Sequence, residues 1–517
     1  MFDTLVSRAA VAVGCYICYV AVILIYRFFF HPLAHIPGPK LAKATYLYEY
    51  YYDLYLVGQY TFKLQELHKK YGPIIRINPD EIHINDPDYI DEVYNMGRVH
   101  KTPRLAEVFG PHPAIISTQP HELHRLRRRA INPFFSKKAV AELIPAIQSP
   151  LDILCKRLDD ASKTGETLNM KYMYAAVTMD IIRDYCFARK PENVFKPDFG
   201  RKAFDDVDGF LEASILNVHI PWFMRISLSL PNSVNKILAP AMADIFEFRS
   251  VGGPSMNVGR GLNQEQELSL QIEAIRHGEN RSYEKAGHRT VFHELLESKL
   301  PPEELERDRL RDEAFGLVTA GSGTTAYVLR GTSYHIAANP SIRQRLYDEL
   351  KAAMPDPSHP PSPQELEQLP YLSAVVLEGL RLCEPVSHRS NREFPDKALN
   401  YHGYIIPPGT GVGMTSYLTH HNEEIFPESR VFRPERWLEG GKQLERYLVS
   451  FNRGTRACLG LNLARTELFM ILAAVFRQFD FDVSEVSRKR DIDVSRDFML
   501  AGQAKDSPGI LVKVRKY

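Results

Sequence analysis

One short segment constrains this chain more than any other. Residues 451–460 read FNRGTRACLG, with a single cysteine, Cys458, between Gly454 and Gly460. The apolar stretch at residues 461–476 that follows predicts a helix. A thiolate just before a helix is stabilised by unpaired backbone N–H groups and by the helix dipole. The two glycines carry no Cβ, so a flat partner could approach the backbone closely. A buried anionic sulfur is costly unless it coordinates a metal, which makes Cys458 a candidate metal ligand.

An ordinary buried thiol is the alternative interpretation of Cys458, because free cysteine is among the most buried residue types. The spacing Phe-x-x-Gly-x-Arg-x-Cys-x-Gly, however, resembles the haem-binding loop of the cytochrome P450 family. The resemblance implies that Cys458 is the axial ligand of a haem b iron and that Phe451 packs near it. It also places Arg456 and Gly460 in the cofactor-binding loop. A thiolate ligand gives haem iron electron density that favours O–O cleavage.

Composition narrows the class of protein. The 517 residues carry a net charge of +1, with 44% hydrophobic and 25% charged residues, which is ordinary for a globular protein. Such a balance argues against a nucleic-acid binder, which usually has a basic excess. The six cysteines show no zinc or disulfide spacing, and this favours a reducing compartment.

The N-terminus predicts a membrane anchor. Residues 9–26 contain no charged side chain and are long enough to span a bilayer as a helix. A signal peptide or a buried core helix are the alternatives, but a proline-rich break at residues 35–39 follows the stretch. Basic residues lie mostly after it (Arg27, Lys40 and Lys43), which places the body of the protein in the cytosol. We expect a single-pass protein of the endoplasmic reticulum membrane.

These observations give a domain plan and a fold class. We expect an anchor at residues 1–30, a proline-rich linker at 31–43 and a catalytic domain at 44–517. The resemblance implies a fold that is mainly α with a small β region, the cytochrome P450 fold, preceded by one expected transmembrane helix. Expected segments are a helix at 44–71, two strands at 74–77 and 81–84, a loop at 101–120, helices at 143–185 and a flexible insertion at 251–270. The apolar stretch at 204–226 resembles the lid helices of the family, and plain packing in the core is the alternative interpretation.

A long apolar helix at residues 312–334 is interrupted by the sequence AGSGTT at 320–325. Threonines inside helices usually bond back to a carbonyl, and that interpretation is open here. The resemblance instead implies a kinked helix over the haem, where Gly321 supplies a dioxygen groove and the Thr324 hydroxyl feeds protons. The family usually has an acid directly before that threonine, whereas this chain has Gly323. Water or Thr325 would then take the place of the acid.

Basic side chains elsewhere could bind the haem propionates. In the family an aromatic donor and an arginine four residues apart do so, and the matching positions are His124 and Arg128, with histidine in place of the usual tryptophan. Without the resemblance, the basic run at residues 121–129 would be a solvated helix face. The motif also implies that Arg392 reaches a propionate.

A glutamate and an arginine three residues apart, Glu378 and Arg381, could be an ordinary surface ion pair. Their apolar neighbours predict burial, and buried charges need further partners. The resemblance implies that the pair binds Arg436 and supports the haem loop, a structural role.

The function that the resemblance implies is a haem-thiolate monooxygenase that inserts one oxygen atom from O2 into an apolar small molecule by hydroxylation or epoxidation. Segments such as FFS at 134–136 look most similar to fungal enzymes of secondary metabolism, which suggests a terpenoid or polyketide substrate. Expected partners are an NADPH–cytochrome reductase, with cytochrome b5 as a further donor, and membrane lipid, but no nucleic acid. A haem-thiolate isomerase or dehydratase that needs no reductase, and a haem-binding protein without catalysis, are the alternatives.

Overall fold

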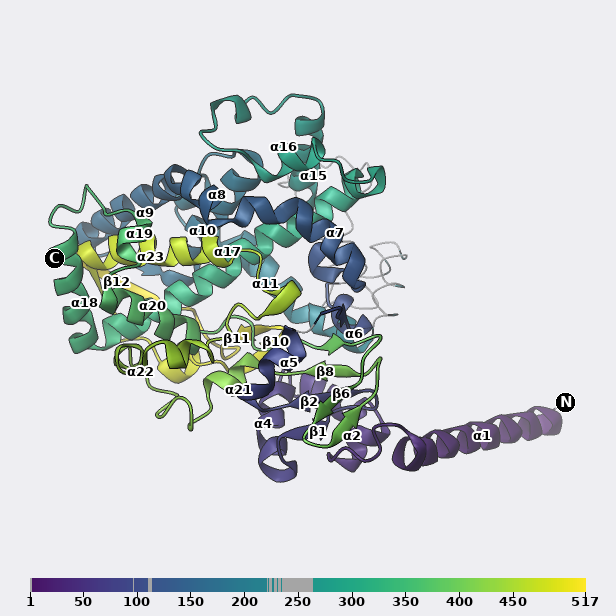
Figure 1. Ribbon diagram of the computed structural model, residues 1–517. Helices are drawn as coiled ribbons and strands as arrows, with labels where there is room; N and C mark the ends of the chain where they lie inside the picture. Colours follow the sequence, from purple (N-terminus) through teal and green to yellow (C-terminus); the bar gives the residue numbers. More distant parts are fainter. Residues whose placement is uncertain are drawn as a thin grey trace. The chain divides into compact units, whose positions relative to one another are not determined.

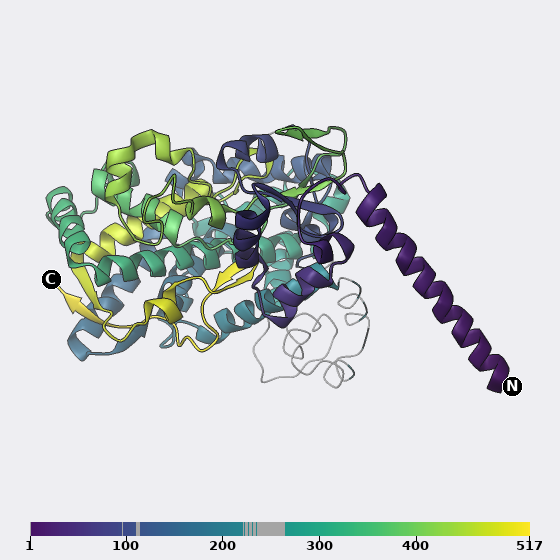
Figure 2. The ribbon, with the colours of Figure 1, turned by 90° about the horizontal axis from the view of Figure 1, so that it is seen from below.

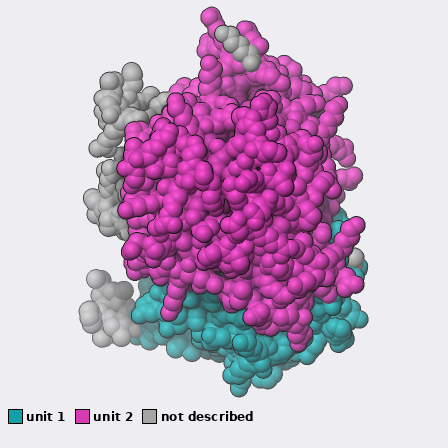
Figure 3. Space-filling model, turned by 90° about the vertical axis from the view of Figure 1, so that its left-hand side faces the viewer, with its two compact units in different colours: residues 1–102, 389–415 teal, residues 103–388, 416–517 magenta. Residues whose placement is uncertain are grey.

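The structure is a computed structural model that describes residues 2–95, 97–109, 114–220 and 264–517, together with Trp222, Ile226, Leu230 and Val234. It is mainly α-helical, with small sheets, as the sequence predicts (Figure 1). The chain divides into two compact units, residues 1–102 with 389–415 and residues 103–388 with 416–517 (Figure 3). We describe each unit by itself.

Unit 1 begins with the predicted apolar helix. Residues Ser7–Phe30 have a mean hydropathy of 2.3 and none of them is buried, so this helix is long and apolar enough to cross a membrane. Its helices are α1 (Phe2–Ile25), η1 (Tyr26–Phe30), α2 (Lys40–Ala44), α3 (Leu47–Tyr50), η2 (Tyr51–Tyr55), α4 (Tyr60–Tyr71), η3 (Pro87–Tyr89) and α5 (Ile90–Tyr94). Its strands are β1 (Ile74–Arg76), β2 (Glu81–Ile84), β3 (His100–Lys101), β5 (Arg392–Glu393), β6 (Leu399–Tyr401), β7 (Tyr404–Ile406) and β8 (Gly411–Gly413).

The main sheet of unit 1 has the strand order β1-β2-β8-β5-β3. The predicted strand–turn–strand is confirmed, because β1 and β2 pair antiparallel with Ile74 opposite Ile84. Only β2 and β8 run parallel among the described strands of this sheet. The expected single helix at 44–71 is wrong: it is divided into α3, η2 and α4, since Val57 and Gly58 both adopt a positive φ that a helix cannot accommodate.

Unit 2 holds most of the helices. Before residue 264 these are α6 (Pro103–Ala106), η4 (Ile115–Ser117), α7 (His121–Ile131), η5 (Asn132–Phe135), α8 (Lys137–Glu142), α9 (Ile144–Thr164), α10 (Met170–Phe187), η6 (Asn193–Phe195) and α11 (Arg201–His219). After it come α15 (Gln264–Arg276), η8 (Tyr283–Lys285), α16 (Val291–Leu296), η9 (Pro302–Leu305), α17 (Arg307–Ala338), α18 (Pro340–Ala353), α19 (Pro363–Leu366), α20 (Pro370–Leu382), α21 (Ser416–His420), α22 (Glu435–Glu445), η10 (Gly454–Arg456), α23 (Leu461–Gln478) and η11 (Arg488–Ile492). Its strands are β4 (Thr167–Asn169), β9 (Phe479–Asp482), β10 (Arg496–Phe498), β11 (Leu500–Gly502) and β12 (Leu511–Lys516), with sheet order β4-β12-β9 and a β10-β11 hairpin.

The 32-residue helix α17 is the central element of unit 2 (Figures 1 and 2). Helices α10, α20 and α23 all pack against it. Small residues allow the close approach of α20: a Cβ on Gly379 would lie 2.2 Å from the Thr332 hydroxyl oxygen, and one on Gly331 would lie 2.6 Å from Cys383 Sγ. Burial of the apolar side chains on these helices forms one large core.

Three expectations about elements need correction. The helix expected at 312–334 extends over Arg307–Ala338 and is not interrupted at residues 320–325, where both glycines keep helical geometry within the long helix. The loop expected at 101–120 contains the short helices α6 and η4. The helices expected at 143–185 are separated by strand β4, whose backbone pairs with β12. Residues 251–263 of the expected insertion and part of the lid at 204–226 lie outside the described residues, whereas residues 264–270 belong to α15 (Gln264–Arg276), so the expected insertion is wrong for these seven residues.

Candidate functional site

The cysteine loop is a tight turn that leads into α23. The Cys458 N–H donates to the Phe451 carbonyl over 2.8 Å, which closes the loop. Asn452 and Gly454 both adopt positive φ values, of 54° and 71°, and the glycine does so without steric cost. Gly460 is the N-cap of α23, so Cys458 lies just before the helix, as predicted. The turn therefore presents the thiol at a helix N-terminus.

Cys458 is exposed, whereas the other cysteines of unit 2 are buried or half-buried. Protein nonetheless surrounds it, and burial raises the pKa of its thiol, while the Gly460 N–H and the Arg128 guanidinium oppose this rise. A thiol that is both accessible and surrounded faces a space inside the fold. Burial raises the pKa of Cys155 and of Cys383 to about 12, and these two thiols stay protonated at neutral pH.

The middle of α17 carries an uncovered stripe, which we define as Ala320, Gly323, Thr324 and Tyr327. Ala320 and Gly323 are exposed and the other two are partly exposed, although this helix is central to the unit. The spacing of three, four and seven residues puts them on one helix face. Helix α17 packs against α23, the helix that Cys458 precedes. The uncovered stripe and the accessible thiol therefore lie on two helices of the same unit that are in contact.

Gly321 does not belong to the uncovered stripe, and its role in a dioxygen groove stays a prediction. A Cβ on Gly321 would lie 2.8 Å from Ile182 Cγ1 on α10, so this glycine is a packing residue between two helices. A Cβ on Gly323 would meet no atom within 4 Å. The small residues that leave the stripe open are thus Ala320 and Gly323. Sequence reasoning missed Ala320, although its position one turn before Thr324 could have indicated it.

The two threonines of this helix have different surroundings. The Thr324 hydroxyl lies on the stripe and donates to the Ala320 carbonyl over 2.8 Å, the ordinary bond of a helical threonine. Thr325 is 4% exposed and forms a hydrogen bond with the Glu467 carboxyl group on α23. Sequence reasoning did not single out Glu467, because a glutamate in an apolar helix gives no signal until its neighbours are known.

Two of the predicted propionate ligands are on α7. His124 is buried, and Arg128 lies one turn later on the same side of the helix. The Arg128 guanidinium donates to the Ala457 carbonyl over 2.8 Å and to Asn132 Oδ1 over 2.6 Å. Arg128 therefore attaches α7 to the residue preceding Cys458 and places a positive charge near the thiol.

Arg456 connects the cysteine loop to another segment. Its guanidinium donates to the carbonyls of Thr118 and Gln119 over 2.8 and 2.7 Å. Arg127 extends this contact, since it donates to the Thr118 hydroxyl over 2.7 Å and forms an ion pair with Glu304 over 2.8 Å. In this structure Arg456 thus holds the end of the segment at 101–120, which the sequence predicts as a loop.

Arg392 belongs to unit 1, where it begins β5. It is 5% exposed, and its guanidinium lies 5.2 Å from the ring centre of Tyr94. Its side chain donates to the Ser390 and Asn391 carbonyls. Its role toward a propionate stays a prediction.

The predicted ion cluster lies in unit 2, and its members are in contact. Glu378 and Arg381 are both 0% exposed and form an ion pair over 2.7 Å. Arg436 donates to the same Glu378 oxygen over 3.1 Å, and the Trp437 indole donates to the other oxygen over 2.9 Å. The remaining Arg381 donors bind the His420 and Ser429 carbonyls. The cluster joins α20 to α22 and to the chain ahead of the cysteine loop.

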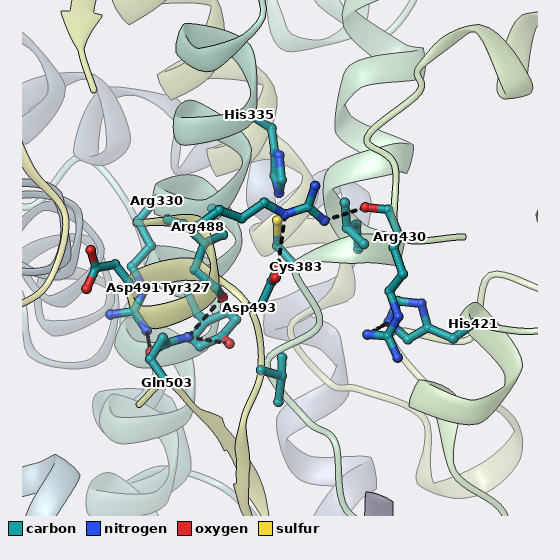
Figure 4. A pocket seen from close by; sticks show the side chains of 14 residues that line it. Tyr327, Arg330, His335, Cys383, His421, Arg430, Arg488, Asp491, Asp493 and Gln503 are labelled. Carbon is teal, nitrogen blue, oxygen red and sulfur yellow. Dashed lines mark hydrogen bonds and ion pairs between the residues drawn. The ribbon is translucent and has the colours of Figure 1, made fainter. Parts of the chain in front are cut away.

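Two other hollows in unit 2 are poor substrate sites. The cavity in Figure 4, lined by Arg330, His335, Cys383 and Arg488 among others, has a volume of about 20 Å³. That volume holds about one water molecule and excludes an organic substrate. A second hollow of about 380 Å³ between α9 and α23 is large enough for a small molecule, but Cys155, whose thiol is protonated, is its only cysteine.

The residues present fit a haem group. The donor set is an accessible thiol at a helix N-terminus, with a backbone N–H and a guanidinium that favour its thiolate. A Cβ on Gly460 would meet no atom within 4 Å, so the backbone beside the thiol is open to a flat ligand. The uncovered stripe of α17 supplies a second face of small residues.

Comparison with known proteins agrees with this geometry. The sequence model of the family described as Cytochrome P450 matches residues 50–506. A cytochrome P450 monooxygenase of Cochliobolus heterostrophus is 40% identical over 99% of this chain and 98% of its own. One from Ascocoryne sarcoides is 38% identical over 96% and 97%. A tryptophan 6-hydroxylase of Fusarium equiseti is 36% identical over 95% and 94%.

Proposed function

Because the chain belongs to the cytochrome P450 family and is an oxidoreductase with the monooxygenase relatives described above, we propose that it inserts one oxygen atom from O2 into an apolar small molecule. The observation that carries this proposal is the accessible Cys458 thiol at the start of α23, in the same unit as an uncovered face of α17. The catalytic domain is residues 44–517. The reaction is a hydroxylation or an epoxidation.

The residues of this chain have distinct tasks. Cys458 binds the iron of haem b, and Phe451, Gly460 and Arg456 form the loop around it. Arg128, with His124 and Arg392, binds the propionates. Haem with a thiolate ligand supplies the reductive activation of O2 when bound. Thr324 and Thr325 move protons toward the uncovered stripe, and the Glu378 cluster holds the loop in place.

Electrons reach this family from a redox partner, and here we propose an NADPH–cytochrome reductase, with cytochrome b5 as a further donor. The exposed helix Ser7–Phe30 supports a single-pass anchor in the endoplasmic reticulum membrane, in contact with lipid, with the catalytic domain in the cytosol. The exposed arginines of α7, among them Arg125 and Arg129, supply positive charge for an acidic partner.

The substrate is a secondary metabolite in this proposal, with a terpenoid or polyketide scaffold preferred. The fungal relatives support a place in specialised metabolism. One relative at 36% identity is named a tryptophan 6-hydroxylase, so aromatic indoles belong in a substrate screen as well. Consumption of NADPH that depends on substrate separates this proposal from an isomerase and from a haem-binding protein without catalysis.

The decisive experiment is the carbon monoxide difference spectrum of the reduced protein. The wild type is expected to show the strongly red-shifted Soret band of thiolate-ligated haem, and Cys458→Ser is expected to lose it. Cys155→Ser is the matched control, because that thiol is protonated and distant in sequence, and it should keep the band. A wild type that is folded and haem-loaded but lacks the band would refute the proposal.

A further inference from the structure

One buried acid of unit 2 has no role in the site described so far. Glu467 lies on α23 and is 1% exposed. Among the described residues it forms no ion pair, in contrast to Glu378 and Glu304, whose carboxylates are bound by arginines. A carboxyl group buried without a cation is costly in its charged form, so such a residue usually has a reason to be retained.

The hydrogen bonding of Glu467 is incomplete. A hydrogen bond joins its carboxyl group to the Thr325 hydroxyl on α17. Its Oε1 is buried and has no hydrogen-bond partner within the described residues. Thr325 directly follows Thr324 of the uncovered stripe. The carboxyl group thus contacts the residue that directly follows Thr324 of the stripe. Its second oxygen is still able to bind a proton or a water molecule.

Burial raises the pKa of Glu467 to about 8, and the Thr325 hydroxyl opposes that rise. No charged or titratable group on α17, on α23 itself or on the other described helices packed against α23 contributes to the shift. The carboxyl group therefore holds its proton at neutral pH and releases it near pH 8. A group of this kind can act as both proton donor and acceptor under physiological conditions.

The stripe itself contains no acid. The position directly before Thr324 is Gly323, and a Cβ there would meet no atom within 4 Å. The four residues of the stripe offer only the Thr324 and Tyr327 hydroxyl groups for proton transfer. A proton that reaches this face must come from a side chain behind it or from water.

We propose that Glu467 is the proton source for the uncovered stripe of α17, acting through the Thr325 hydroxyl in place of an acid at Gly323. The inference rests on the proposed function. Glu467 is a positioning and proton-holding residue, because it acts through Thr325 and does not line the open face. Its proton moves to the Thr325 oxygen, while the Thr325 proton moves on toward the stripe.

The proton balance is that of the proposed reaction. Substrate, O2, NADPH and one proton give the oxygenated product, water and NADP⁺. The second oxygen atom leaves as water and takes up two protons, one of which is supplied by Glu467. A proton from solvent then restores the carboxyl group, so Glu467 is unchanged over one turnover.

The first test requires no turnover. In infrared difference spectra of the haem-loaded protein, the carboxylic C=O band of Glu467 should disappear as pH rises through about 8, and the band should be absent from Glu467→Gln. The stability of Glu467→Gln relative to wild type should also increase with pH. The folded wild type keeps a proton between the pKa values of the unfolded and folded states, and so loses stability as pH rises there. A carboxylate band already present at pH 6 would overturn the inference.

The second test measures coupling, the share of consumed NADPH that appears as product instead of hydrogen peroxide. Coupling in wild type should fall as pH rises through about 8. In Glu467→Gln it should be lower by a factor on the order of ten, with no inflection near that pH, because general acid transfer contributes at least that much. Thr325→Val should resemble Glu467→Gln, whereas Thr325→Ser and Glu467→Asp should keep the pH dependence. Glu445→Gln on the exposed part of α22 is the matched control.

A rescue experiment separates proton supply from packing. Gly323→Asp in the Glu467→Gln background places a carboxyl group on the open face, where there is room for it, and coupling should recover. A Glu467→Gln protein with a normal carbon monoxide spectrum and wild-type coupling at every pH would overturn the inference and leave the proposed function intact. If Glu467→Gln fails to fold, the comparison of Thr325→Val with Thr325→Ser tests the inference in its place. Absence of the thiolate band in wild type would refute the proposed function, whatever the infrared titration shows.

Discussion

Two glycines on α17, two residues apart, have opposite surroundings, and the difference can be measured. Gly321→Ala would place a methyl group 2.8 Å from Ile182 Cγ1, and overpacking of this kind should cost about 1–2 kcal/mol of unfolding free energy after the gain in helix propensity. Gly323→Ala meets no atom within 4 Å and should stabilise the protein by about 0.5–1 kcal/mol. Urea unfolding of both variants tests the pair.

The contact partner provides the control for this prediction. In an Ile182→Ala background, the cost of Gly321→Ala should shrink, since the atom that it meets is gone. Equal costs in both backgrounds, or equal effects of the two glycine substitutions, would contradict the assignment of Gly321 to helix packing.

The buried histidine of α17 predicts a pH dependence of stability. The His335 ring stacks on Phe432 at 4.9 Å, and burial lowers the pKa of His335 to about 3. The unfolded chain binds a proton near pH 6.5 and the folded chain does not, so stability falls as pH drops below 6.5. In His335→Phe the slope of the unfolding free energy against pH should be smaller by up to about 1.4 kcal/mol per pH unit between pH 6 and pH 4. Denaturant unfolding at pH 7, 6, 5 and 4 measures it, and parallel curves for the two proteins would refute it.

At the scale of elements, the Glu378 cluster fixes α20 to α22. Glu378→Gln would leave the buried guanidinium groups of Arg381 and Arg436 without a counter-charge. We expect a loss of about 3–5 kcal/mol in unfolding free energy, together with weaker haem retention, because the cluster holds the chain that leads to Cys458. Haem loss on heating, followed by absorbance, measures the second effect.

A more exposed ion pair beside the cluster serves as the comparison for Glu378. Glu439 on α22 contacts Arg433, which lies just before this helix, and Glu439→Gln should change stability by no more than about 0.5 kcal/mol. If the two substitutions cost the same, the burial of the Glu378 cluster is not what stabilises this part of the fold.

For the whole molecule, we expect the N-terminal helix to decide whether the protein is bound to a membrane. A chain without residues 2–25 should move from the membrane fraction to the soluble fraction and keep its carbon monoxide band, because none of the span at Ser7–Phe30 is buried. Deletion of residues 2–30 would also remove Arg27, which donates to the Ala44 carbonyl over 2.6 Å and whose own carbonyl accepts from Arg76 over 3.0 Å. The longer deletion should therefore be less stable than the shorter one, and thermal unfolding compares them. Membrane retention of the shorter form would point to a further lipid contact.

The sequence alone determined the family and the helical class, and it predicted the apolar N-terminal helix and the position of the Cys458 thiol just before α23. These depend on local patterns: a cysteine between two glycines before a helix, a run of apolar residues without charge, and the pairing of short strands. The sequence also predicted that Glu378 and Arg381 are buried, because apolar neighbours of a charged pair predict burial and a need for partners, and the resemblance to the family identified Arg436 as that partner.

Only the tertiary structure decided which face each residue of α17 presents. The sequence AGSGTT does not reveal that Gly321 packs against Ile182 whereas Gly323 stays open, since the partner helix lies more than a hundred residues away in the chain. The same holds for Glu467: its pKa is raised to about 8 by the helices that surround it. Desolvation depends on what surrounds a group in space, and sequence neighbours do not record it.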